Sequence, residues 1–200
     1  DQGVTPQELA DKNAGEFRRL TSVLNISNDQ FIRTTEEYHI KSSQLLWQKI
    51  AAADALYKKT YEGLYCVGCE AYITEKDLLD GLCPNHKKPP ITFKEENYFF
   101  RYSKYLPRIK ELIKNGTLKI IPESRKNEML MMIESGMDEE RDISFSRPTE
   151  SLAWGIPVPG DPTQTMYVWC DALSNYTSGA GLGTDEQKFN TLWPADVHLI

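Results

Sequence analysis

The 200-residue sequence lacks several features that would mark particular classes of protein. No apolar run approaches the ~20 residues that a transmembrane helix requires, so we expect no membrane span. Acidic residues outnumber basic ones by 29 to 23, and the net charge of -6 argues against binding nucleic acid through bulk charge, although it still allows a local basic patch. The segment DQGVTPQELADKN has neither the basic start nor the apolar core of a secretion signal. We therefore expect a soluble protein.

Cysteine is scarce, and the four cysteines show no even disulfide framework. Three of them fall within CVGCEAYITEKDLLDGLCPNH, residues 66–86, which we call the knuckle. Its four candidate ligands form two pairs, each separated by two residues: Cys66 with Cys69, and Cys83 with His86. Three thiolates and one imidazole are the number and type of ligands found in closed tetrahedral zinc sites. The knuckle is therefore predicted to bind one zinc ion.

The turns inside the knuckle favour this interpretation. Gly68 lies within the first pair and Pro84 within the second, so each tight turn can direct two ligands at one ion. A site closed by four protein ligands leaves no position for water, and its predicted role is structural. The alternatives are two unrelated surface turns or a disulfide, and a disulfide would leave an odd cysteine and no role for His86. Clustered metal-type cysteines also suit a reducing compartment.

The remaining composition is that of a folded protein, with 40% hydrophobic and 26% charged residues, enough for one large domain or two small ones. The capping-box pattern of Thr5 and Glu8 predicts a helix start, and Thr34 and Glu37 have the same spacing. Further helices are expected over 103–114 and after Pro122. Aromatic and β-branched residues predict strands on both sides of the knuckle, at 60–66 and 91–103.

Two other stretches contain candidate functional residues. His39 lies in the second predicted helix near its buried edge, and we interpret it as a packed structural histidine rather than a catalytic one. In MYVWCDALSNY a strand is expected to pass into a helix, which places Trp169, Ala172 and Tyr176 at i, i+3 and i+7. Two rings with a small residue between them could form a pocket for a slim thioether side chain. On periodicity alone, ordinary core packing is the better explanation.

The sequence also resembles a known family along nearly its whole length. The segments that carry the resemblance occur in the family's order: GVTPQELADK, DQFIRTTEEYH, YEGLYCVGCEAYIT, KEENYFFRYSKY, SFSRPTESLAWGIPVPGD, MYVWCDALSNY and WPADVHLI. Together they resemble an internal piece of the methionyl-tRNA synthetase family, which belongs to the class I aminoacyl-tRNA synthetases. The knuckle resembles the family variant with a single zinc bound by three cysteines and one histidine.

The resemblance implies an α/β fold: a fragment of a Rossmann catalytic domain with an inserted, small α+β connective domain that carries the zinc knuckle. Residues 1–57 would be the helical part of the first catalytic half, and 58–146 the connective domain. Residues 147–200 would begin the second catalytic half.

The implied activity is that of a ligase, which joins methionine to ATP and transfers the methionyl group to tRNA(Met). ATP and Mg2+ would serve the parent enzyme, a cytoplasmic monomer without membrane contact, with the mitochondrial matrix as the alternative location. Neither family ATP motif, HIGH or KMSKS, occurs in the chain. We therefore expect an internal fragment that is inactive alone and contains no catalytic residue. The alternatives are an autonomous zinc-knuckle RNA-binding module and a structural domain.

The resemblance also assigns roles to individual residues. The methionine side-chain pocket would be lined by Trp169, Ala172, Leu173 and Tyr176. Leu173 stands where some members carry proline, which suggests a subtype. Arg147 and Asp171 would support the active site, although a structural ion pair explains Arg147 almost as well. Arg33 would likewise support the active site, with a structural ion pair as the alternative explanation. Cys170 is assigned no chemistry.

Overall fold

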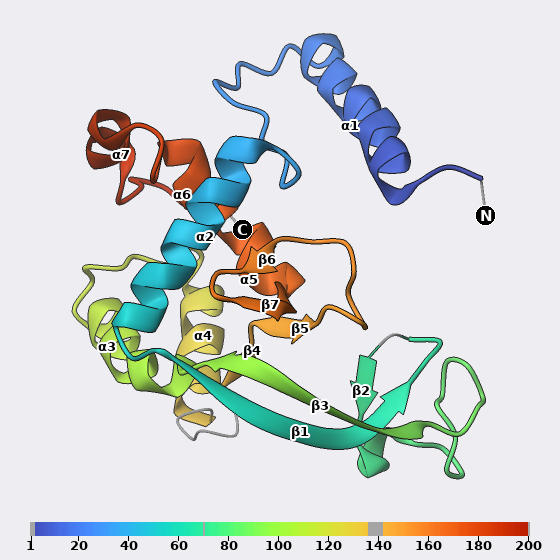
Figure 1. Cartoon of the computed structure of the whole chain (residues 1–200). Helices are drawn as coiled ribbons and strands as arrows, with labels where there is room; N and C mark the ends of the chain where they lie inside the picture. The colour runs from blue at the N-terminus through green and yellow to red at the C-terminus, as the bar shows by residue number, and fades with distance from the viewer. Residues whose placement is uncertain (1–2, 70, 136–141, 200) are drawn as a thin grey trace. The chain divides into compact units, whose positions relative to one another are not determined.

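The computed structural model describes residues 3–69, 71–135 and 142–199 of the chain (Figure 1). Its contacts divide the chain into two compact units. The first unit consists of Asp1–Leu46 and Asp171–Ile200, and the second of Trp47–Cys170. The helices α2 (Glu37–Ala52) and α5 (Val168–Leu173) each cross a boundary between the units. None of the helices in the described ranges has both the length and the apolar content needed to span a bilayer.

The first unit contains α1 (Pro6–Val23), most of α2, α6 (Asn175–Ala180) and α7 (Glu186–Leu192). The predicted capping box of α1 is confirmed, because the Thr5 hydroxyl accepts the Glu8 N–H and the Glu8 carboxylate accepts the Thr5 N–H. The second predicted start is wrong by two residues, since a cap at Thr34 would begin the helix at Thr35. Thr34 lies in a turn, which the Glu36 N–H closes by donating to the Arg33 carbonyl, and α2 begins only at Glu37.

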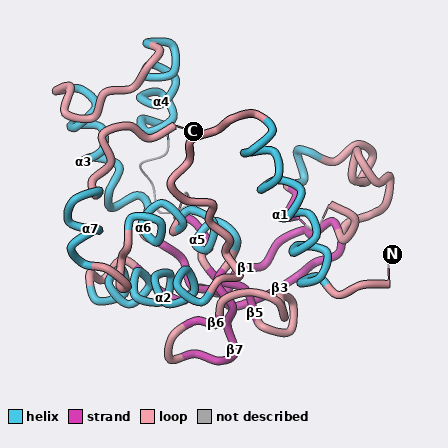
Figure 2. The backbone as a smooth tube through the Cα atoms, turned by 90° about the horizontal axis from the view of Figure 1, so that it is seen from above, coloured by secondary structure: helices cyan, strands magenta, loops and turns pink. Residues whose placement is uncertain are grey.

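The second unit is organised around a long antiparallel ribbon of β1 (Leu56–Cys66) and β3 (Ile91–Phe100), which lie side by side in both views (Figures 1 and 2). Their register runs from Leu56 opposite Phe100 to Tyr65 opposite Ile91. The short strands β2 (Ala71–Ile73) and β4 (Ile143–Ser144) extend the sheet to the order β2-β1-β3-β4. The aromatic strands predicted on both sides of the knuckle are therefore partners in one ribbon.

A second sheet in this unit has the order β5-β7-β6 and is also antiparallel. Its strands are β5 (Ser146–Pro148), β6 (Pro157–Val158) and β7 (Asp161–Met166). The mixed α/β class is confirmed, but every strand pair among the described residues is antiparallel, so the parallel Rossmann sheet is not seen there. The physical reason is that the chain reverses direction between paired strands, by a tight turn between β6 and β7 and through the knuckle between β1 and β3, whereas parallel neighbours need crossover connections.

The helices α3 (Tyr102–Lys114) and α4 (Glu123–Ser135) confirm the two predicted helical stretches. They pack through the buried side chains of Leu106, Ile113 and Ile133, with Met129 and Leu130 partly buried beside them. A single 3-10 turn, η1 (Glu75–Asp77), lies within the knuckle. The second unit therefore combines the ribbon, the small sheet and this helical pair.

Candidate functional site

The knuckle brings its four predicted ligands together at one end of the ribbon. Cys66 is the last residue of β1, Cys69 follows in the turn before β2, and Cys83 and His86 lie in the loop before β3. The ligand atoms all lie within 4.8 Å of one another. Since a zinc ion with bonds of about 2.3 Å to sulfur has tetrahedral edges of roughly 3.8 Å, these donors suit a single such ion.

Individual distances agree with a tetrahedral donor set. The Sγ atoms of Cys69 and Cys83 are 3.5 Å apart, and the Nδ1 atom of His86 lies 3.1 Å from Cys69 Sγ and 3.7 Å from Cys66 Sγ. None of the four cysteines forms a disulfide, so the disulfide alternative is wrong. The alternative of two unrelated turns is also wrong, because both turns meet at this cluster.

Gly68 is needed in the knuckle because it faces the imidazole of His86. A Cβ atom at Gly68 would lie 2.5 Å from Cδ2 and 2.6 Å from Cγ of that ring, which is closer than van der Waals contact allows. Outside the four ligands, the Asn85 side-chain amide lies 3.7 Å from Cys69 Sγ and can donate to it. The first turn of the knuckle therefore has no room for a side chain at Gly68 beside the His86 ring.

The thiols of the knuckle differ in their electrostatic surroundings. The backbone N–H of His86 favours the Cys83 thiolate and, against the opposing effect of burial, lowers the pKa of Cys83 to about 6. At Cys69 the Asn85 amide lowers the pKa, but the neighbouring thiols of Cys83 and Cys66 raise it, and the net change is an increase. Crowded thiolates repel one another, and a bound cation would relieve that repulsion.

The predicted pocket residues lie on α5 and on the following α6. Trp169, Ala172 and Leu173 belong to α5, and Tyr176 belongs to α6. Trp169 is 55% exposed, Leu173 is 53% exposed, and Tyr176 and Ala172 are more covered. Core packing therefore does not explain the two most exposed members, and the role of all four in a methionine pocket stays a prediction. Within the first unit, the ring of Tyr176 contacts that of His198, with centroids 4.0 Å apart.

Asp171 lies on the same helix, but its side chain pairs with α2. Its Oδ1 atom is 2.8 Å from Nε2 of His39, whose side chain is fully buried, and Nδ1 of His39 lies 2.9 Å from the Ser178 hydroxyl. The interpretation of His39 as a packed histidine is consistent with this burial. Its two partners lie 132 and 139 positions away in the sequence, so no local pattern could have identified them.

Arg147 is held in a structural network of the second unit. Its guanidinium stacks 3.8 Å from the centroid of Tyr167, and its Nε atom lies 3.4 Å from the buried carboxylate of Glu95. Glu95 also accepts from the side-chain amide of Asn97 at 2.7 Å. These contacts match the ion-pair explanation, and the predicted support of an active site stays untested. Arg33 pairs with Asp11 in the first unit.

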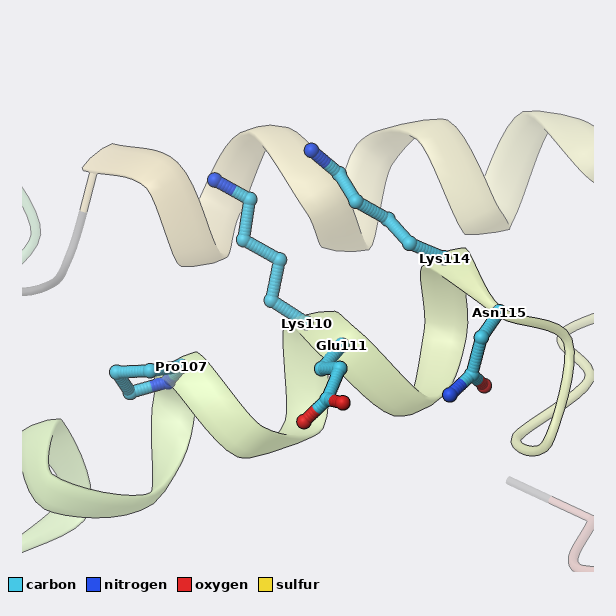
Figure 3. A pocket seen from close by; sticks show the side chains of 5 residues that line it. All are labelled: Pro107, Lys110, Glu111, Lys114 and Asn115. Atoms are coloured by element: carbon cyan, nitrogen blue, oxygen red, sulfur yellow. The ribbon is translucent and has the colours of Figure 1, made fainter.

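A pocket of the second unit lies apart from these residues. It measures about 490 Å³ and is lined by side chains of α3 and by Asn115, the residue that follows the helix (Figure 3). Lys110 and Lys114 extend from α3 toward α4, where both pair with Glu134. A shallow surface flanked by one helix pair lacks the convergent polar groups of a binding site.

Comparison with known proteins identifies the family. The family model described as tRNA synthetases class I (M) matches residues 1–90 and 77–200. The methionine-tRNA ligase of Clostridium perfringens is 44% identical over the whole chain, which covers 30% of that relative, and the one from Brucella melitensis is 43% identical with 38% covered. The crystal structure of Mycobacterium tuberculosis methionyl-tRNA synthetase bound by methionyl-adenylate is 39% identical, with a TM-score of 0.83 over 98% of this chain and 39% of that one.

The chain belongs to the class I tRNA synthetases and, within them, to the methionyl-tRNA synthetase family. It spans about a third of the length of the relatives it matches.

Proposed function

We propose that the protein containing this chain activates methionine with ATP and transfers the methionyl group to tRNA(Met). The observation that carries the proposal is the match to M. tuberculosis methionyl-tRNA synthetase, which has a similar fold over 98% of this chain and was solved with methionyl-adenylate bound. Activation of this kind is an attack of the methionine carboxylate on the α-phosphate of ATP. Catalysis depends on positioning the two substrates and on neutralising phosphate charge.

Trp169, Ala172, Leu173 and Tyr176 line the methionine side-chain pocket in this proposal. Two features support it: the resemblance of the segment MYVWCDALSNY to the family, and the exposure of Trp169 and Leu173, which a core position would bury. Aromatic rings and a small residue suit an unbranched, polarizable thioether. Asp171 and Arg147 are further residues proposed to support the active site.

The knuckle holds one structural zinc ion in this proposal, with Cys66, Cys69, Cys83 and His86 as ligands. The donor set and the ligand separations support zinc, and four protein ligands leave no open position for a substrate. Its contribution is therefore to the folding of the connective domain. We place that domain at 58–146, between a first catalytic part at 1–57 and a second at 147–200, and we propose a Rossmann domain for the catalytic parts.

The proposed partners are those of the reaction: tRNA(Met), methionine, ATP and its Mg2+. We further propose a monomer located in the cytoplasm. The 200 residues alone contain neither HIGH nor KMSKS, so they are expected not to form the adenylate.

Methionine-dependent exchange between ATP and pyrophosphate tests the activity. The full-length protein should catalyse exchange, and Ala172→Phe, which fills the pocket with a ring, should raise the KM for methionine by at least about tenfold. The matched control Ala10→Phe places the same ring on α1, away from the pocket, and should leave that KM unchanged. Exchange that does not depend on methionine would refute the proposal.

A metal assay tests the knuckle. About one zinc per chain is expected, and Cys69→Ser should lower both zinc content and folding stability. Cys170→Ser is the matched control, because it removes a cysteine outside the cluster and should retain the metal. Full zinc content in Cys69→Ser would remove Cys69 from the ligand set. Salt-dependent binding of an RNA stem by the isolated chain would instead favour the RNA-binding alternative.

A further inference from the structure

The first unit contains a buried polar network between α2 and the segment 171–178. His39 Nε2 lies 2.8 Å from Asp171 Oδ1, and His39 Nδ1 lies 2.9 Å from Ser178 Oγ. One helical turn after His39, the Ser43 hydroxyl lies 2.6 Å from that of Ser174. The side chains of His39 and of the three serines are almost fully buried. A network of this kind is stable only if its members are satisfied, so it fixes one arrangement of the two segments.

The chemistry of the network defines its bonds. A carboxylate can only accept, so Nε2–H of His39 donates to Asp171. On the other side of the ring, Nδ1 lies 2.9 Å from the Ser178 hydroxyl, which also lies 3.1 Å from the Asn175 carbonyl oxygen. The Ser174 hydroxyl donates to the Asp171 carbonyl at 2.7 Å, which ties the network to the backbone of α5. The imidazole of His39 thus bridges the end of α5 to α6.

The residues of the segment 171–178 that bind α2 and those proposed for the pocket lie on opposite faces of the segment. The residues bound to α2 are spaced i, i+3 and i+7: Asp171, Ser174 and Ser178. At roughly 100° of rotation per residue, the proposed pocket residues Ala172, Leu173 and Tyr176 lie on the opposite face. Ser174, at the junction of α5 and α6, has helical backbone angles of -68° and -11°, so this count carries across the junction. The face that carries Asp171, Ser174 and Ser178 is therefore held against α2, and the opposite face takes no part in these bonds.

We propose that His39 is a positioning residue for the methionine pocket, acting by holding Asp171 and Ser178 and so fixing Ala172 and Tyr176 on the opposite face. The inference rests on the proposed function, because it assigns His39 to that same site. His39 has no exposed surface and does not touch the substrate. Loss of its bonds to Asp171 and Ser178 would let the segment shift, which weakens methionine binding more than ATP binding.

The test uses the full-length protein and the methionine-dependent exchange of ATP and pyrophosphate. His39→Ala is expected to raise the KM for methionine by about tenfold and to change the KM for ATP by less than about twofold. His39→Gln, which can still donate to Asp171, should recover part of that loss. A merely structural role would lower the active fraction, and hence the apparent kcat, without moving the KM for methionine.

Ser42→Ala is the matched control. Ser42 is the buried neighbour of Ser43 on α2, and its hydroxyl has no hydrogen-bond partner among the described residues, so its removal leaves the network intact. This variant should keep the wild-type KM for methionine. If His39→Ala does not fold, Ser178→Ala decides the question. It removes the Nδ1 contact and the bond from the Ser178 hydroxyl to the Asn175 carbonyl, leaves the contact of His39 with Asp171, and should raise the KM for methionine by about threefold.

The outcomes separate this inference from the function on which it rests. An active wild-type protein whose folded His39 or Ser178 variants keep the wild-type KM for methionine would overturn the positioning role alone. A wild-type protein without methionine-dependent exchange would overturn the proposed function and the positioning role together.

Discussion

Asp161 connects parts of the second unit that are distant in the sequence. Its carboxylate accepts from the Thr163 hydroxyl at 2.6 Å and from the Tyr98 hydroxyl at 3.2 Å, and it pairs with Lys58 at 2.9 Å. The Thr163 hydroxyl and the Lys58 ammonium stabilise the ionised form and lower the pKa of Asp161 from 3.8 to about 2. One carboxylate therefore links β7 to both strands of the ribbon.

Asp161→Asn should lower the free energy of unfolding by about 1 kcal/mol at pH 7, a value reduced for the screening of a partly solvated pair. Because the folded-state pKa is depressed, the stabilisation is present above the ordinary pKa of 3.8 and is lost as the pH falls toward 2. Urea unfolding between pH 7 and pH 2 measures the difference from wild type. Asp29→Asn, at an exposed position, is the control, and a difference independent of pH would contradict this account.

Single residues also show where sequence reasoning succeeds and where it ends. The spacing of Cys66, Cys69, Cys83 and His86 predicted their cluster, because two residues between ligands fix a tight turn. The close approach of Gly68 to the His86 ring was not predictable, since it depends on how the two turns meet. The partners of His39 were not predictable either, because Asp171 and Ser178 are more than 130 positions away in the sequence.

Among the elements, the α3 and α4 pair has the best-defined core. Ile133 is 1% exposed and packs with Leu106 and Ile113, whereas Met131 on the same helix is 71% exposed. Substitutions at Ile133 and Met131 therefore allow the effect of losing a buried side chain to be compared with that of losing an exposed one in the same helix.

Ile133→Ala should destabilise the protein by about 3 kcal/mol, because it removes buried apolar atoms and leaves a cavity. Met131→Ala, at the exposed position, should change stability by less than about 0.5 kcal/mol. Urea unfolding followed by circular dichroism compares the two. Equal effects of both substitutions would show that the pair does not pack as described.

Local signals predicted the elements better than their pairing. The capping box of Thr5 and Glu8 was sufficient for α1, because both groups lie within one turn. The same spacing at Thr34 failed, since a turn there delays α2 to Glu37. The aromatic run of β3 predicted a strand, but its antiparallel register with β1 depends on the connecting knuckle. The expected parallel sheet came from the resemblance and is not among the described strands.

At the scale of the whole molecule, the family is established by similarity along the entire chain, while the chain spans about a third of its relatives. The chain contains the proposed methionine pocket and zinc knuckle, and it contains neither ATP motif. A methionine site and an ATP site must act together in adenylate formation. The proposed activity therefore belongs to the full-length protein.

The most direct test of this account is the charging of tRNA by the full-length protein with each of the twenty amino acids in turn. We expect methionine to be attached to tRNA(Met) and the other amino acids to be rejected, because the proposed pocket at Trp169, Ala172 and Tyr176 would suit a thioether side chain. Preferential attachment of another amino acid, or no charging by a folded, zinc-loaded protein, would contradict it.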